Sequence, residues 1–391
     1  MIFSPAVVEA PTMRIVLLYN YLPLHVGGIE AVVHSLAREW SRRGHEVAVV
    51  GADVGQRIRP STQAYRLIGL PALNGLETRF GVPYPLPSPM LLPRLAREIR
   101  RADVVHAHGF LCLPTLAAFG ISRALGRRAP VKLLTEHVAH VRYDSPVLDA
   151  VERLAIATLG RASARAADGI VVFNSRVAAE IRALAPKVPQ RWIVNGVDAS
   201  LFSPATPSEK ARLRAELGWD DHPRVLFVGR LVAKKGADLA AAAAGLAGGA
   251  FKLVMAGPGS LPNANSEQVA LLGALPPERV AMLYQAADAF LLPSRGEGFP
   301  LTAQEALACG LPVFLGEDEA YAPYLAGAGQ SIHLLPPDAP AVAAELVRFL
   351  ANPARREQAR QDAIELARTF SWERAVDEHE RFVEELRQQR S

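Results

Sequence analysis

Short, continuous apolar segments alternate with helical patterns along nearly the whole chain, and this alternation strongly limits the possible folds. In the first half the apolar segments cover residues 14–20, 46–52, 103–109, 131–137 and 169–175. They are rich in Val, Ile and Leu and lack polar alternation, which is typical of parallel strands covered on both faces. Helical patterns fill the intervals at 30–43, 113–125, 147–166 and 176–185. Repeated βα units of this kind predict a doubly wound parallel sheet.

The same pattern starts again after a segment rich in Ser and Pro at 198–210, which we interpret as a linker. The second set of apolar segments covers 225–230, 251–257, 289–294, 311–316 and 331–336. We therefore predict an α/β protein with two Rossmann-like domains facing each other across a cleft. The expected limits are an N-terminal domain at 1–200, a C-terminal domain at 201–370, and a helix at 371–391 that returns to the first domain. Ligands of such sheets bind at the carboxyl ends of the strands.

Composition agrees with two globular domains. A chain of 391 residues that is 50% hydrophobic and 21% charged has enough apolar surface for large cores, which excludes a disordered or fibrous protein. Its two cysteines, Cys112 and Cys309, fit a reduced protein of the cytoplasm. No apolar run reaches about 18 residues, and residues 1–13 lack the basic start of a signal peptide. We expect a cytoplasmic protein.

Charge is distributed unevenly between the halves. Residues 1–200 carry 24 Lys and Arg against 15 Asp and Glu, a net charge of +9, whereas residues 201–391 carry 19 against 24, a net charge of −5. This predicts an anionic partner for the first half, either acidic lipid or a polyanionic substrate; we expect no nucleic acid. Two basic clusters lie at 94–103 and 126–130, and the first has Leu95 and Ile99 at helical spacing. The first cluster predicts a basic amphipathic helix that makes peripheral contact with the inner face of the membrane. Two alternatives to a membrane-binding role are an ordinary solvated helix that covers the sheet and a general bias of the chain toward Arg.

Two glycines, Gly27 and Gly28, stand where the first predicted helix begins. Without Cβ atoms, their backbone amides can approach a phosphate at the helix N-terminus, although a plain tight turn would also use them. The dinucleotide fingerprint GxGxxG after the first strand and the P-loop pattern GxxxxGK[ST] are both absent. A nucleophile elbow GxSxG is absent too, so a dehydrogenase, a P-loop ATPase and a serine hydrolase are all disfavoured.

Cations follow the first strand of the second half. Arg230 ends that strand and Lys235 stands near the next helix, so both are expected at the carboxyl edge. Two cations there can neutralise a diphosphate leaving group without a metal. The alternative is a pair of solvated charges on a turn. No DxD motif occurs in the chain, and we expect no metal and no cofactor.

The segment 293–310 carries two acidic residues, Glu297 and Glu305. Between them, the amides near Gly298, Phe299, Pro300 and Leu301 are expected to hold phosphate oxygens, and Glu297 to accept hydrogen bonds from sugar hydroxyls. For Glu305 two interpretations stay open. It can bind a ligand, or it can close a capping box with Thr302, which stands three residues before it.

Three histidines follow strands of the first half. His106 and His108 share a strand and one of its faces, and we interpret them as core or site-lining residues rather than metal ligands. His137 ends the next strand and is a candidate to contact a sugar hydroxyl or an acceptor.

Taken together, GGIE at 27–30, the His137 site, NGVD at 195–198, VGRL with KKG at 228–236, and the two glutamates resemble the retaining glycosyltransferases of family 4, which have the GT-B fold. The resemblance implies that the first domain binds the acceptor and the second a nucleotide-sugar. It implies that Arg230 and Lys235 hold the donor diphosphate, assisted by the backbone of 298–301 and by Gly27 and Gly28. Glu297 and His137 would contact the sugar, Glu305 the ribose hydroxyls, and 271–273 the base.

The function that we expect is a metal-independent, retaining transfer of a sugar from a nucleoside diphosphate to a hydroxyl, in the synthesis of a cell-envelope glycolipid or polysaccharide. A same-face displacement fits, because no carboxylate is evidently placed as a nucleophile. Two other functions stay open: a nucleotide-sugar epimerase of the same fold, and a protein that binds a nucleotide-sugar without turnover. The sequence leaves the donor sugar, nucleotide, acceptor and oligomeric state undetermined.

Overall fold

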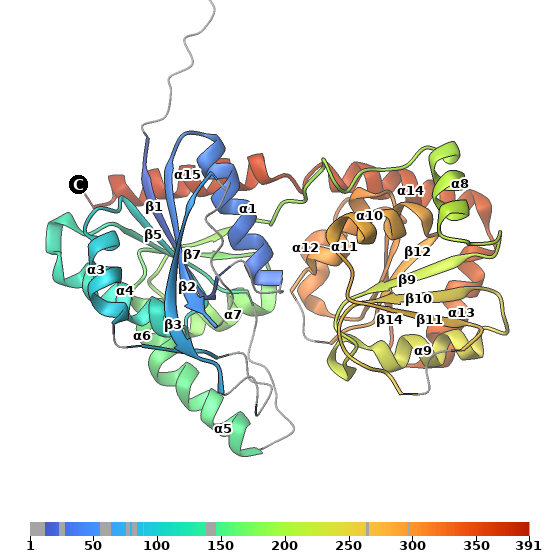
Figure 1. Ribbon diagram of the computed structural model, residues 1–391, viewed down its shortest axis with the longest axis horizontal. Helices are drawn as coiled ribbons and strands as arrows, with labels where there is room; N and C mark the ends of the chain where they lie inside the picture. Colours follow the sequence, from blue (N-terminus) through green and yellow to red (C-terminus); the bar gives the residue numbers. More distant parts are fainter. Residues whose placement is uncertain are drawn as a thin grey trace, which may run out of the picture. The chain divides into compact units, whose positions relative to one another are not determined.

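The computed structural model describes residues 12–22, 28–54, 64–75, 79, 84–88, 90–137, 146–262, 266–295 and 298–390. The chain divides into two compact units, both of which are α/β (Figure 1). Unit 1 comprises Met1–Val172, Glu180–Ile193 and Val376–Ser391, and unit 2 comprises Phe173–Ala179 and Val194–Ala375. The domain limits expected from the sequence stay predictions.

Unit 1 is built on an eight-stranded sheet in the order β4-β3-β2-β1-β5-β6-β7-β8, in which every neighbouring pair is parallel except β3 with β4. Its strands are β1 (Arg14–Tyr21), β2 (Glu46–Asp53), β3 (Arg66–Leu73), β4 (Leu86–Pro87), β5 (Val104–His108), β6 (Val131–Thr135), β7 (Gly169–Val172) and β8 (Gln190–Trp192). Its helices are α1 (Gly28–Arg42), α3 (Leu91–Ile99), α4 (Leu113–Ala124), η1 (Gly126–Arg128), α5 (Pro146–Ala155), η2 (Ile156–Gly160), α6 (Arg161–Ala166) and the second half of α7 (Ser175–Leu184).

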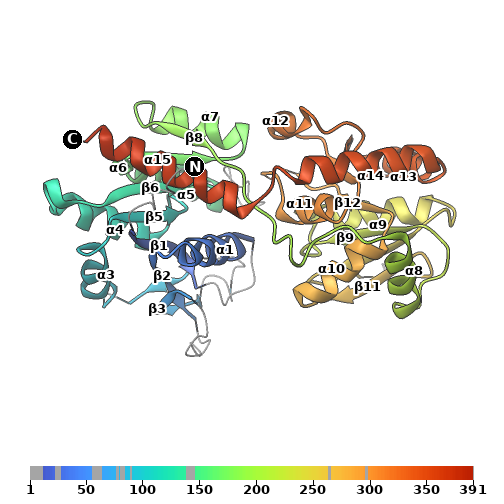
Figure 2. The same cartoon turned by 90° about the horizontal axis from the view of Figure 1, so that it is seen from above.

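The C-terminal helix α15 (Trp372–Gln388) starts in unit 2 and packs from Val376 onward on unit 1 (Figure 2). Its buried side chains Phe382 and Leu386 leave no room for a Cβ at Gly169, where that atom would lie 2.5 Å from the Phe382 ring. The polar side of the helix pairs with α1 and the segment after it, through Arg43 with Glu380 at 3.2 Å. Burial of the apolar face supplies most of the stabilisation, because an ion pair gains little net free energy once its desolvation is counted.

Unit 2 contains a six-stranded, wholly parallel sheet in the order β11-β10-β9-β12-β13-β14. Its strands are β9 (Arg224–Val228), β10 (Lys252–Ala256), β11 (Val269–Gly273), β12 (Ala289–Leu292), β13 (Val313–Gly316) and β14 (Ile332–Leu335). Its helices are α8 (Pro207–Glu216), η3 (Ala233–Lys235), α9 (Ala237–Leu246), α10 (Pro277–Ala286), α11 (Leu301–Ala308), η4 (Glu319–Tyr321), α12 (Ala322–Leu325), α13 (Ala339–Leu350) and α14 (Pro353–Ala367).

The predicted fold class is confirmed: two parallel α/β sheets, with the last helix passing from the second unit to the first. All ten predicted strands are present within a few residues. The sequence analysis missed β3, β4, β8 and β11, which lie at or beside the edges of their sheets. These strands are partly exposed, so they lack the continuous apolar composition that buried strands need.

Helix α3 forms at the first basic cluster, but its apolar residues serve the core. Leu95 and Ile99 are 1% and 0% exposed, so they are buried in unit 1. The prediction that these two residues face a membrane is therefore wrong, and α3 is the solvated helix of the alternative interpretation. Among the described residues, no helix is both long and apolar enough to cross a bilayer.

Candidate active site

At the carboxyl edge of the unit 2 sheet, the backbone segments that follow three strands lie in direct contact. Gly257, which follows β10, has a φ of +146°, and a Cβ there would lie 1.9 Å from the carbonyl oxygen of Gly229 after β9. Gly236, at the start of α9, has a φ of +71°, and its Cβ would lie 2.3 Å from the carbonyl oxygen of Pro293 after β12. Only glycine fits both the conformation and the space. The turns after β9, β10 and β12 therefore form one packed surface.

The predicted cations lie on this surface. Arg230 directly follows Gly229; its side chain is exposed, and its guanidinium makes no hydrogen bond or ion pair within the described part of the chain. Lys235 ends η3 and is half-buried. The sequence analysis did not single out Arg295, whose amide donates to the carbonyl oxygen of Lys234 at 3.1 Å and whose side chain is exposed. Its position directly after the predicted strand at 289–294 could have indicated it as a site residue.

The loop before α11 is anchored by its aromatic residue. Phe299 is buried and stacks on Tyr324 of α12, with ring centroids 4.0 Å apart and an interplanar angle of 12°. Its side chain therefore belongs to the core, and only its backbone can face a ligand. Pro300 is the N-cap of α11, and the amides of Leu301 and Thr302 donate to no described residue. With Gly298 half-buried before them, these amides leave the helix N-terminus without described acceptors, which is the arrangement that anion sites use. Glu297 lies outside the described residues.

Glu305 does not form the capping box that the sequence allowed. The helix begins two residues earlier than that pattern requires, and Pro300, its N-cap, cannot supply a capping side chain. Instead the hydroxyl of Tyr284, on α10, donates to Glu305 Oε2 at 3.2 Å. Burial raises the pKa of Glu305 to about 7, against a weaker opposing effect of that hydrogen bond. Glu305 thus presents a half-buried carboxyl group that accepts a proton or a hydroxyl donor readily.

In unit 1, Gly28 is the first residue of α1, and a Cβ built on it would meet no atom within 4 Å. No described atom therefore crowds the Cβ position of Gly28. Gly27 lies outside the described residues.

His137 follows β6 and is largely buried, at 7% exposure. Its Nε2 is hydrogen-bonded to Nδ1 of His108, the last residue of β5, at 2.8 Å, and the two rings stack. The carboxylate of Glu136 accepts from the amides of His137 at 3.0 Å and of Phe110 at 2.9 Å, which ties the ends of both strands together. Burial holds the pKa of His137 down at about 3, so its ring is neutral at physiological pH.

Behind this pair the histidines continue into the core. His106 is fully buried and bonds Thr135 Oγ1 through its Nε2 at 2.7 Å, and its ring centroid lies 4.4 Å from that of His108. Burial also holds the pKa values of His106 and His108 well below the usual range. Nδ1 of His106 and Nε2 of His108 are buried and have no hydrogen-bond partner among the described residues. The sequence analysis predicted that both residues lie in the core or line a site. It could not predict the bond between His108 and His137, because that bond depends on the pairing of β5 with β6.

Two family models match the chain. The model described as "Glycosyltransferase Family 4" matches residues 26–201, and the one described as "Glycosyl transferases group 1" matches residues 209–366. With both units matched, the chain belongs to the family 4 glycosyltransferases, and the resemblance seen in its motifs is confirmed. The protein is a glycosyltransferase.

Among curated relatives, a D-inositol 3-phosphate glycosyltransferase of Acidothermus cellulolyticus is 27% identical over 390 residues, covering 90% of this chain and 84% of the relative. One from Catenulispora acidiphila is 29% identical over 390 residues, covering 90% and 89%. Among solved structures, sucrose-phosphate synthase from Thermosynechococcus elongatus is similar with a TM-score of 0.74 at 22% identity, covering 96% of this chain and 99% of that one. The Anabaena protein HepE, in complex with UDP, has a TM-score of 0.75 at 15% identity, covering 96% and 100%. These structures share the GT-B fold.

Proposed function

We propose that this glycosyltransferase uses a nucleoside-diphosphate sugar as donor and transfers the sugar to a hydroxyl group with retention of configuration, without a metal ion. The observation that carries the proposal is the carboxyl edge of unit 2. There an exposed guanidinium, that of Arg230, stands on the same packed surface as Lys235 and the open N-terminus of α11. Cations and helix amides are the groups that stabilise a departing diphosphate.

The other site residues receive roles under this proposal. Arg230 and Lys235 neutralise the diphosphate, and the backbone of 298–301 assists them. The Glu305 carboxylate accepts hydrogen bonds from the ribose hydroxyls, and the neutral ring of His137 makes a hydrogen bond with the transferred sugar. Glu297, Gly27 and Gly28 keep the roles that the family resemblance implies. The similar fold of HepE, solved with UDP and with UDP-glucose, supports a nucleotide-sugar as donor.

For the acceptor, we propose a phosphorylated polyol as the first compound to test, because the curated relatives are D-inositol 3-phosphate glycosyltransferases. A cell-envelope glycolipid or polysaccharide is the second. A cytoplasmic location and peripheral contact with an anionic membrane stay part of the proposal.

Transfer assays with UDP-, GDP- and ADP-sugars, with and without inositol phosphate, test the function. We expect a glycosylated acceptor with one nucleotide class, and product NMR should show the donor's anomeric configuration. Formation of an epimer without acceptor would instead indicate an epimerase. Tight nucleotide-sugar binding with no product from any acceptor would indicate a binding protein.

Binding of the donor nucleotide is expected to release a fraction of a proton near pH 7. Ribose hydroxyls that donate to Glu305 favour its ionised form and so lower a pKa that burial holds at about 7. Calorimetry in buffers of different ionisation enthalpy measures the release. Glu305→Gln should abolish it, and Glu317→Gln is the control. An equal release from the Glu305→Gln protein would contradict the assignment.

Activity is expected to survive EDTA within about twofold, because the cations take the place of a metal at the leaving diphosphate. The chain contains no DxD motif, which motivates this expectation. Initial rates before and after chelation provide the measurement. Complete loss of activity that manganese or magnesium restores would show that the reaction needs a metal.

A further inference from the structure

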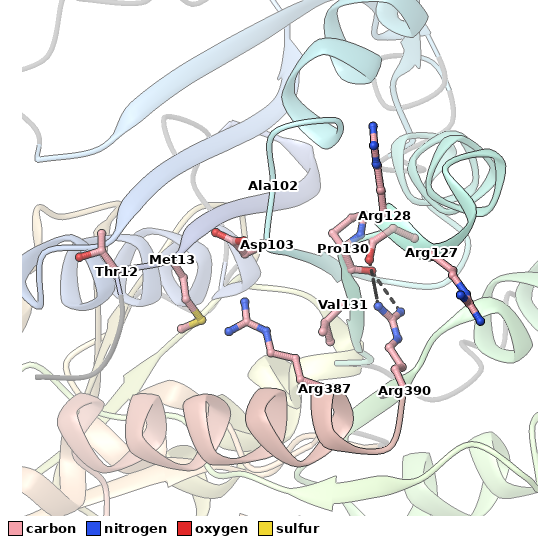
Figure 3. Close-up of a pocket in the computed structure, with 11 residues that line it drawn as sticks. Thr12, Met13, Ala102, Asp103, Arg127, Arg128, Pro130, Val131, Arg387 and Arg390 are labelled. Atoms are coloured by element: carbon pink, nitrogen blue, oxygen red, sulfur yellow. Dashed lines mark hydrogen bonds between the residues drawn. The ribbon is translucent and has the colours of Figure 1, made fainter. Parts of the chain in front are cut away.

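A pocket of about 350 Å³ lies at the amino edge of the unit 1 sheet (Figure 3). Met13 precedes β1, Asp103 precedes β5 and Val131 begins β6, so all three mark strand starts. The candidate active-site residues follow strand ends instead. Strand β5 runs from Val104 to His108, and five residues at about 3.3 Å each separate the two edges by roughly 15 Å. The pocket is thus distinct from the site described above.

Four arginines and one aspartate line this pocket, which gives its lining a net formal charge of +3. Arg390 extends from the end of α15 to Pro130, whereas Arg387 extends toward Met13 and Asp103 (Figure 3). Arg127 and Arg128 come from η1 and extend in different directions along its outer side (Figure 3). The acid, Asp103, accepts a hydrogen bond from the amide of Arg14 at 2.7 Å.

The arginines differ in how they are held. Arg390 donates to the carbonyl oxygens of Ala129 at 3.0 Å and Pro130 at 3.1 Å, and it pairs with Asp168, so it is fixed in place. Arg127 and Arg128 are exposed, and their guanidinium groups bond to no residue that the structure describes. The first is a fixed side of the pocket whose charge Asp168 balances, and the guanidinium groups of the other two have donors free for a ligand.

The two basic clusters of the sequence meet at this edge. Arg100 and Arg101 directly precede the lining residues Ala102 and Asp103, and both are exposed. They add to the positive potential around the pocket without lining it. Clusters about 30 residues apart in sequence, together with the end of the chain, thus build one cationic surface.

We propose that this pocket is a second anion site, which binds a ligand bearing two or more phosphate groups. Guanidinium groups bind phosphate oxygens in a bidentate manner, and several of them around one cavity favour a multiply charged ligand over a single carboxylate. Such phosphates are found on free polyphosphorylated molecules and on the headgroups of phosphorylated lipids. The pocket accepts either, because both present the same oxygens.

The test measures binding of inorganic tripolyphosphate by calorimetry at about 50 mM salt. The reference protein, whose pocket is unchanged, and the variants all carry Arg230→Ala and Lys235→Ala, so that the proposed donor site does not contribute. The test variant adds Arg127→Glu and Arg128→Glu. The control adds Lys187→Glu and Arg374→Glu, which makes the same change in net charge at exposed positions that do not line the pocket. We expect the test variant to bind at least tenfold more weakly and the control to stay within about twofold.

Co-sedimentation with vesicles distinguishes a lipid headgroup from a free ligand. One set of vesicles contains phosphatidylcholine alone, and the second contains phosphatidylcholine with 5% phosphatidylinositol bisphosphate. Binding to the second vesicles that needs Arg127 and Arg128 assigns the site to a lipid headgroup, whereas binding of tripolyphosphate alone assigns it to a free ligand. Equal losses in test and control variants, or no binding of either probe by the wild-type pocket, would overturn the proposal. In the native background, transfer activity of the Arg127→Glu, Arg128→Glu protein should be unchanged, which separates this site from the proposed function.

Discussion

Replacing Arg230 with alanine is expected to lower kcat/KM for the sugar donor by about 100-fold or more, and Lys235→Ala should have an effect of similar size. A fixed cation beside the leaving diphosphate stabilises charge that develops in the transition state, and losing one such contact costs about 3 kcal/mol. Arg230 is exposed and free of described partners, so its removal should leave folding intact. The loss should therefore appear in turnover and not in thermal stability.

Steady-state kinetics with thermal midpoints measured alongside test this expectation. Lys234→Ala is the matched control, because Lys234 is an exposed neighbour of Lys235 with the same charge but no proposed contact with the donor. It should keep its activity within about twofold. Near-normal kinetics in both the Arg230 and the Lys235 variants would refute the diphosphate assignment, and an equal loss in the Lys234 variant would reduce it to a general electrostatic effect.

The strands that could be predicted from the sequence are those buried on both faces. Strands such as β12 and β13 are continuous apolar segments because each has a neighbour on both sides and helices above and below. Edge strands have no such requirement. β11 is largely exposed, and β3 carries Gly69 and Pro71, which weaken its strand pattern.

The position of part of the candidate site could be predicted because it follows a strand that is buried on both faces. Arg230 follows a buried strand, so its position at the carboxyl edge was fixed once the strand was recognised. Glu305 was different, because its local pattern fitted two roles equally well. The choice depended on Tyr284, a residue of another helix whose distance from Glu305 no local pattern encodes.

Tertiary packing also decided the role of the apolar residues that the sequence analysis assigned to membrane contact. Leu95 and Ile99 have the spacing of a membrane-facing helix, but the same spacing serves a helix that covers a sheet. Their burial leaves Arg94, Arg97, Arg100 and Arg101 exposed in that region, with Leu92 exposed only at the start of the helix. The anionic partner expected from charge therefore has a pocket as its candidate site, rather than an apolar helix face.

Unit 1 is expected to lose stability in mild acid because it buries neutral histidines. Burial holds the pKa values of His106, His108 and His137 below the ordinary value of 6.5. Below pH 6.5 the unfolded chain takes up protons that the folded unit does not, so folding free energy that is fully present above pH 6.5 is lost as the pH falls. Each group should cost about 1 kcal/mol between pH 6.5 and 5.5, or about 3 kcal/mol together. In unit 2, the raised pKa of Glu305 acts in the opposite direction and offsets the effect of the buried His333.

Hydrogen exchange of peptides from β5 and β6, followed from pH 7.5 to 5.5 and corrected for intrinsic rates, reports the free energy of opening unit 1 without requiring reversible unfolding of the whole chain. His108→Asn removes one of the three groups and should make the pH dependence about one third shallower, although the lost bond to His137 lowers stability at pH 7.5. His222→Asn is the control, because that ring is exposed and should leave the slope unchanged. A flat profile for the wild-type protein would show that these rings are protonated in the folded state. The neutral ring assigned to His137 in sugar binding would then be wrong as well.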